Sequence, residues 1–178
     1  MKRILGLCLL VLTLVLSASA QTAYKTPQFS VTFAGSSVDA WSKPNKQNTS
    51  VDYFYASTTD GAFSIEQTVA YRVIGAPIDV NTTSLDFYVS VLTHEGETLK
   101  SKEYVPDFQG HIAVAFSVIT KDLRVRRHLL IIHDERTVFL LMQSTAIGNV
   151  DDKQWSDFVN SFGMNEKTCW LPEGCGKP

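Results

Sequence analysis

In the second half of the chain, between Gly110 and Phe162, apolar and polar residues follow a pattern typical of consecutive strands closed by an amphipathic helix. The alternation predicts three consecutive strands, Ile112–Thr120, Leu123–His133 and Thr137–Ile147. Both faces of the third strand are largely apolar, which is typical of a strand at the centre of a sheet that is covered on both sides. The chain is therefore expected to be organised around this stretch.

Two segments repeat their apolar residues with the period of an amphipathic helix. The first is expected to begin near Thr83 and to stop at Gly96. The second is Asp152–Phe162, which Asp151 is expected to cap and Gly163 to stop. Their apolar stripes are Leu85, Tyr88, Val89 and Leu92 in the first helix, and Trp155, Phe158, Val159 and Phe162 in the second.

The first half of the chain contributes further strands. Alternation predicts them at Phe29–Phe33, Val51–Ser57 and Phe63–Val73. The second and third are expected to form a hairpin around the Asp60-Gly61 turn signal. Only Gln67 interrupts the apolar side of the third strand.

The remaining segments complete the predicted order of elements. Glu97–Tyr104 is charged and short of large apolar residues, as edge strands often are. Residues 21–27 are predicted to be a loose leader and residues 34–50 a loop. The order β-β-β-α-β-β-β-β-α predicts one α+β domain, residues 28–164, whose antiparallel sheet is covered by helices.

Residues 1–20 have the features of a secretory signal peptide. A short basic start precedes the apolar run Ile4–Leu16, and Ala18-Ser19-Ala20 matches the small-residue pattern before a cleavage site. A transmembrane anchor is less favoured, because the run is shorter than the roughly 20 residues that span a bilayer. The mature protein is therefore expected to begin at Gln21, to be secreted or periplasmic and to have no membrane span.

The balance of charges narrows the range of partners. The 178 residues carry a formal net charge of −2, and loss of the basic start makes the remainder more acidic. Nucleic acids and anionic membrane surfaces both require a positive field. Neither is therefore expected to be a partner.

Cys169 and Cys175 lie in a tail, residues 165–178, where Pro172 and Gly174 allow the chain to turn back. In an oxidising compartment a local disulfide is the favoured interpretation. Free or intermolecular thiols remain the alternative, because spacing does not show the geometry that a disulfide needs. The five intervening residues and the lack of a partner histidine disfavour a zinc site.

Arg124, Arg126 and His128 share one face of a predicted strand, with Lys121 nearby. Such a strip could receive an acidic partner or an anionic ligand. The alternative is a solvated outer face whose charges form cross-strand ion pairs. No other group of residues in the sequence offers a surface for binding by charge.

The motifs of catalysis and of cofactor binding are not found in the sequence. It contains no G-x-S-x-G elbow, H-E-x-x-H pair, Walker loop or G-x-G-x-x-G. His133-Asp134-Glu135 is the nearest approach to a metal cluster, but adjacent residues of a strand point to opposite faces. A hairpin turn explains these three residues better. No catalytic residue, metal or cofactor is therefore predicted.

Two segments resemble the PsbP-like domain family (Mog1/PsbP fold), which includes small secreted bacterial members of unknown function. Phe29-Ser30-Val31-Thr32-Phe33-Ala34-Gly35 is similar to the family's first strand, and Trp155-x-x-Phe158-x-x-Ser161-Phe162 to its closing helix. The similarity extends from Phe29 to Met164. It implies an α-β-α sandwich and a role in binding or assembly rather than catalysis. No binding-site residue of the family is matched in this sequence.

These observations predict a non-enzymatic module that binds an unidentified protein partner or acts in envelope assembly. A carrier of a small apolar ligand, held between sheet and helix by Phe87, Phe116 and Phe139, is the alternative. The carrier requires a closed apolar pocket of several hundred Å³. Partner binding requires a contiguous exposed patch instead. A hydrolase without a recognisable motif is a third, weaker possibility.

Overall fold

The computed structural model describes residues 21–35, 37–44, 51–58, 65–74 and 76–165. The predicted signal peptide, the Asp60-Gly61 turn and the Cys169 and Cys175 pair lie outside these residues. Among the helices that are described, none is both long and apolar enough to cross a membrane.

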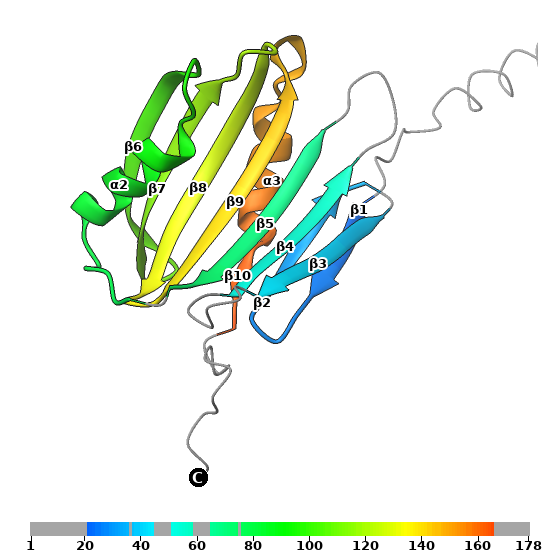
Figure 1. The fold of residues 1–178 in the computed structure, drawn as a ribbon. Coiled ribbons are helices and arrows are strands. Elements are labelled where there is room, and N and C mark those ends of the chain that lie inside the picture. Colours follow the sequence, from blue (N-terminus) through cyan, green and yellow to red (C-terminus); the bar gives the residue numbers. More distant parts are fainter. Residues whose placement is uncertain (1–20, 36, 45–50, 59–64, 75, 166–178) are drawn as a thin grey trace, which may run out of the picture.

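Strands dominate the described chain (Figure 1). The first elements are β1 (Gln21–Lys25), β2 (Phe29–Ala34), β3 (Val38–Pro44), β4 (Val51–Thr58), β5 (Glu66–Val73) and the helix α2 (Thr82–Leu92). They are followed by β6 (Thr98–Phe108), β7 (His111–Ile119), β8 (Arg124–Asp134) and β9 (Thr137–Ala146). The last are a short 3₁₀ helix, η1 (Ile147–Asn149), the helix α3 (Asp152–Ser161) and β10 (Gly163–Met164).

The described strands form two antiparallel sheets. Seven strands lie in the order β3-β4-β5-β9-β8-β7-β6, and the other sheet has the order β1-β2-β10. The central position of β9 confirms the prediction made from its two apolar faces. The edge position of β6 is also confirmed, and most of its residues are exposed. The α+β class is therefore correct.

The two helices cover opposite faces of the seven-stranded sheet (Figure 1). On one face, α2 packs through Leu85 and Val89 against β7, β8 and β9. On the other face, α3 and the small sheet pack together, and Phe29, Phe33 and Phe158 belong to the same buried cluster. Alternation along β8 divides its residues between the two layers: Leu129 and Ile131 face α3, and Leu130 and Ile132 face α2.

Three strands were not predicted, so the expected order of elements was incomplete. The segment expected to be a loose leader contains β1, which pairs with β2 from Gln21 opposite Ala34 to Lys25 opposite Ser30. The segment expected to be a loop contains β3, which pairs with β4. Finally, β10 pairs with the start of β2. β1 is largely polar, β3 mixes apolar and polar residues, and β10 has two residues, so their pairing partners define them rather than an apolar pattern of their own.

The ends of the helices differ partly from the prediction. Asn81, not Thr83, caps α2, since its side chain accepts a hydrogen bond from the Ser84 amide at 2.9 Å. Gly96 has a positive φ of 80° but lies in the turn beyond the helix. Asp151 caps α3 as predicted, through the Gln154 amide at 3.1 Å. Gly163 is not a left-handed stop, because it begins β10.

Candidate binding sites

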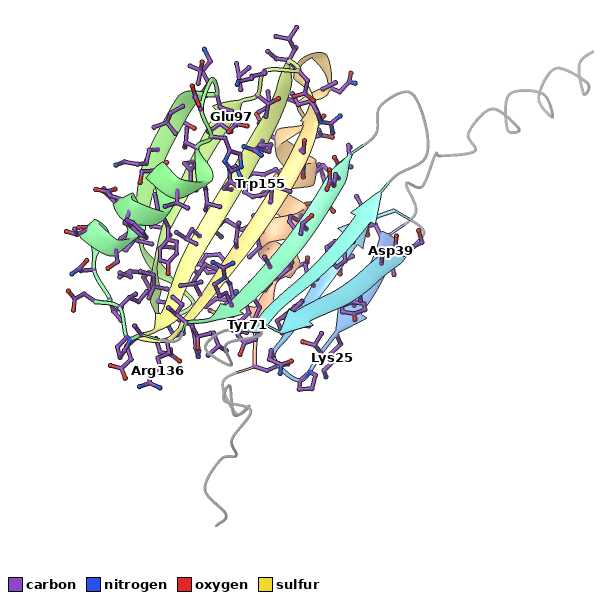
Figure 2. All side chains as sticks on the ribbon, in the orientation of Figure 1. Lys25, Asp39, Tyr71, Glu97, Arg136 and Trp155 are labelled. Carbon is purple, nitrogen blue, oxygen red and sulfur yellow. The ribbon has the colours of Figure 1, made fainter. Side chains whose placement is uncertain are left out.

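The predicted basic strip on β8 is divided between a charged recess and the protein interior. Arg124 and Arg126 line a recess of about 500 Å³ at the end of the sheet where α2 terminates. Figure 2 labels Glu97 at this end and Arg136 at the opposite end. The basic side chains of the recess face the carboxylates of Glu66, Glu95, Glu97 and Asp122. The recess is therefore mixed in charge rather than cationic.

Arg126 is neutralised by a carboxylate that the prediction did not include. Its guanidinium donates to Glu97 Oε2, and the two side chains are only 18 % and 8 % exposed. The same carboxylate oxygen accepts the His94 amide at 3.0 Å. Removing one member of such a desolvated pair leaves a buried charge that costs several kcal/mol, about 3–5. The pair therefore fastens the segment after α2 to β8.

Arg124 is held against the neighbouring strand. Its Nε donates to the Ser144 hydroxyl at 2.8 Å, and a terminal nitrogen donates to the Ser144 carbonyl at 3.0 Å. Beside it, the hydrogen bond from the Thr120 hydroxyl lowers the pKa of Asp122, and the positive charges of Arg124 and Arg126 add to this effect. These contacts match the cross-strand alternative more closely than an open anion site.

His128 does not belong to any surface. Its side chain is 2 % exposed and stacks on Phe116, with ring centroids 4.3 Å apart and planes 9° apart. Burial lowers the pKa of His128 to about 3, and the charges of Arg126 and His94 contribute. The imidazole is therefore neutral at ordinary pH, so it cannot receive an anion.

An apolar surface on and beside α2 was not predicted. Phe87 and Val91, one helical turn apart on the outer side of α2, are 62 % and 53 % exposed. Between α2 and the sheet lies a small apolar recess of about 130 Å³, with Tyr88 and Leu92 from the helix and Leu140 from β9 in its wall. Burial raises the pKa of Tyr88, and nearby Arg72 opposes the rise. Phe87 could have been found from the sequence, because it is apolar but lies off the helix stripe.

The three aromatic residues suggested for a ligand carrier do not converge. Phe87 is exposed, Phe116 is buried in the α2 layer and Phe139 is buried in the α3 layer. The apolar recess beside α2 is also smaller than the roughly 300–1,000 Å³ of ordinary ligand pockets. This space fits one apolar side chain of a partner better than a complete small ligand.

His133, Asp134 and Glu135 end β8 and enter the turn to β9, as predicted. Asp134 Oδ1 accepts the Arg136 amide at 2.7 Å and so closes the turn. The ring of His133 lies 4.5 Å from that of His111 on β7. Within the part of the chain that the structure describes, no group of three or more His, Cys, Asp or Glu side chains could hold a metal ion.

A larger, polar recess lies on the other side of the sheet. It encloses about 700 Å³ between α3 and the strands β1 and β2, and Gln67 of β5 also lines it. Figure 2 shows the adjacent α3 residue Trp155 behind the large sheet, whereas α2 lies in front of it. The signal for this site in the sequence is indirect: it is the polar Gln67 on an apolar strand face.

No protein-family model matches this chain, and no curated protein sequence matches it.

Proposed function

We propose that this protein is a secreted or periplasmic, non-enzymatic binding module that docks a protein partner on the outer face of α2, as part of envelope assembly. The observation that carries the proposal is the exposure of Phe87 and Val91 beside an apolar recess. Exposed apolar groups that gather at one place mark interaction sites more often than scattered ones do.

The size of these features fits a protein partner. Fully burying a phenylalanine side chain contributes about 1.5–3 kcal/mol, and aromatic residues are common anchors at the centre of interfaces. Phe87 would supply such an anchor to the partner. The recess walled by Tyr88 and Leu92 would in turn receive one apolar side chain from it.

Membership of the PsbP-like family belongs to the same proposal. It is supported by the position of α2 and α3 on opposite faces of the sheet, the layering that the resemblance implies. Secretion is supported by the Ala18-Ser19-Ala20 pattern after the apolar run Ile4–Leu16.

Photo-crosslinking from α2 tests the docking surface directly. A photoreactive amino acid at position 87 of the full chain, in the cells that produce it, should give a covalent adduct of discrete size. The same group at position 156, exposed on α3, is the matched control and should not give that adduct. With the partner purified, Phe87→Ser should weaken binding about tenfold or more, whereas Phe87→Leu should retain most of the affinity.

The side chain at position 87 is largely exposed, so neither substitution should unfold the protein. Identical adducts from positions 87 and 156 would contradict a specific surface on α2. So would an affinity that Phe87→Ser leaves unchanged.

A further inference from the structure

A second site lies on the face opposite to α2. We propose that the recess between α3 and β2 binds a neutral saccharide. Its volume of about 700 Å³ is within the roughly 300–1,000 Å³ of ordinary ligand sites. This site is independent of the surface proposed for the protein partner, and either one can fail without the other.

The polar groups of the recess suit a ligand with many hydroxyl groups. Thr32 and Ser161 contribute hydroxyls, and Gln154 and Asn160 contribute amides. Gln67 also lies in the lining, but both of its polar atoms are already hydrogen-bonded within the protein. An amide both donates and accepts hydrogen bonds, as a hydroxyl does. The amides can therefore either donate hydrogen bonds to the hydroxyls of a sugar ring or accept hydrogen bonds from them. An apolar ligand would displace water from these polar groups and would not replace its hydrogen bonds.

One acceptor atom of a residue that lines the recess has no hydrogen-bond donor. Gln154 Oε1 is buried, and no atom of the described residues donates a hydrogen bond to it. A buried acceptor in this state costs about 1–3 kcal/mol. A ligand hydroxyl would supply the donor once the Gln154 side chain turns its amide toward the recess, and the gain would appear only in the bound state.

Gln67 is already fixed in position before any ligand arrives. Its Nε2 donates to Gln143 Oε1 at 3.0 Å, and its Oε1 accepts the Ala34 amide at 2.6 Å. Both glutamines are almost completely buried. Gln67 therefore keeps this part of the recess wall rigid, so the wall loses little freedom when a ligand binds, which favours affinity.

The backbone of β2 argues against a peptide that would extend the sheet. Such a peptide needs free strand-edge amides. Along this edge the Thr32 amide donates to Ser161 Oγ at 2.9 Å, and the Ala34 amide donates to Gln67 Oε1. Side chains thus occupy the amides that a peptide strand would use, and recognition must come from side-chain polar groups.

The charges of the recess select against an anionic sugar. Asp151 and Asp157 line it, and Lys153 is the basic residue in its described lining. Lys153 Nζ already binds Asp157 Oδ2 at 2.5 Å. A carboxylated or phosphorylated saccharide would therefore meet net negative charge, so the ligand is a neutral one.

Titration of the full, ¹⁵N-labelled chain with chitotriose, cellotriose and maltotriose, followed by amide NMR, tests the proposal. At least one trisaccharide should shift resonances of residues 32–34, 67 and 151–161 and leave α2 unchanged. Gln154→Ala and Asn160→Ala should each raise the dissociation constant about tenfold. Ser90→Ala, on α2 and outside the recess, is the control and should leave the dissociation constant unchanged.

Gln154→Ala removes an acceptor that lacks a donor, so the variant should be at least as stable as the parent, and lost binding cannot be ascribed to unfolding. The proposal is overturned if none of the three sugars shifts the recess. Shifts that map to α2, or equal affinity for the Gln154→Ala variant, overturn it as well.

Discussion

At the scale of single residues, His128 is a buried residue of β8 whose imidazole stacks on Phe116 of β7. Its surroundings include Arg126 and His94, whose positive charges oppose protonation, and the burial itself is the larger cause of the low pKa of about 3. An unfolded chain would restore the ordinary value of 6.5. Between these two values the unfolded state binds more protons than the folded state.

This difference predicts an acid-sensitive stability. The contribution of neutral His128 is complete above pH 6.5 and is lost as the pH falls toward 3. Between pH 7 and 4, the free energy of unfolding should fall more in the parent than in His128→Leu, by on the order of 2–3 kcal/mol. Urea unfolding at several pH values measures this difference. Parallel pH profiles would show that His128 does not carry the effect.

At the scale of elements, Gln67 joins three strands. It lies on β5, binds Gln143 on β9 and accepts the Ala34 amide of β2, which links the small sheet to the large one. An apolar residue in its place would leave buried groups on both neighbours unsatisfied. The polar residue in the apolar pattern of β5 is thus a connection between sheets.

Gln67→Leu should therefore lower the free energy of unfolding by about 2–4 kcal/mol, since each unsatisfied buried group costs about 1–3 kcal/mol. Gln143→Leu alone should cost less, because Ala34 keeps its acceptor. The loss of stability in the double variant should be smaller than the sum of the two single losses. Each single substitution already removes the hydrogen bond between Gln67 and Gln143, so the sum counts that bond twice. Chemical denaturation of all three variants checks this, and strictly additive losses would contradict it.

At the scale of the whole molecule, β8 and β9 contribute to both apolar layers. Leu129 and Ile131 belong to the layer under α3, whereas Leu130 and Ile132 belong to the layer under α2. Since the same two strands support both layers, a substitution that destabilises one layer should also lower the stability of the other. The protein is expected to unfold as one cooperative unit.

Leu85→Ala tests this coupling. The side chain is fully buried under α2, so its truncation should cost about 2–5 kcal/mol. Hydrogen exchange of the α3 amides, on the opposite face, should accelerate in proportion to that loss. Phe87→Ala, on the exposed side of the same helix, is the matched control and should change little. Unaltered protection of α3 in the Leu85 variant would show that the layers unfold separately.

Much of the fold could be predicted from local patterns. The two apolar faces of Thr137–Ile147 predicted a central strand, the charged Glu97–Tyr104 segment an edge, and Asp151 a helix start. These features depend on neighbouring residues along one chain segment, where alternation and capping act over a few positions. The sequence by itself therefore determined the α+β class and the central and edge positions of these two strands, but not the second sheet, β1-β2-β10.

Only the tertiary structure decided the surfaces. Arg126 meets Glu97 from a distant part of the chain, His128 is covered by elements other than its own strand, and Gln154 faces a recess formed with β2. The strands β1 and β3 likewise depend on their partners. Such outcomes depend on which segments lie side by side, and local periodicity contains no information on that. For this reason the sequence left open whether the strip of Arg124, Arg126 and His128 binds an anion or forms ion pairs, and in the folded protein it is mostly paired or buried.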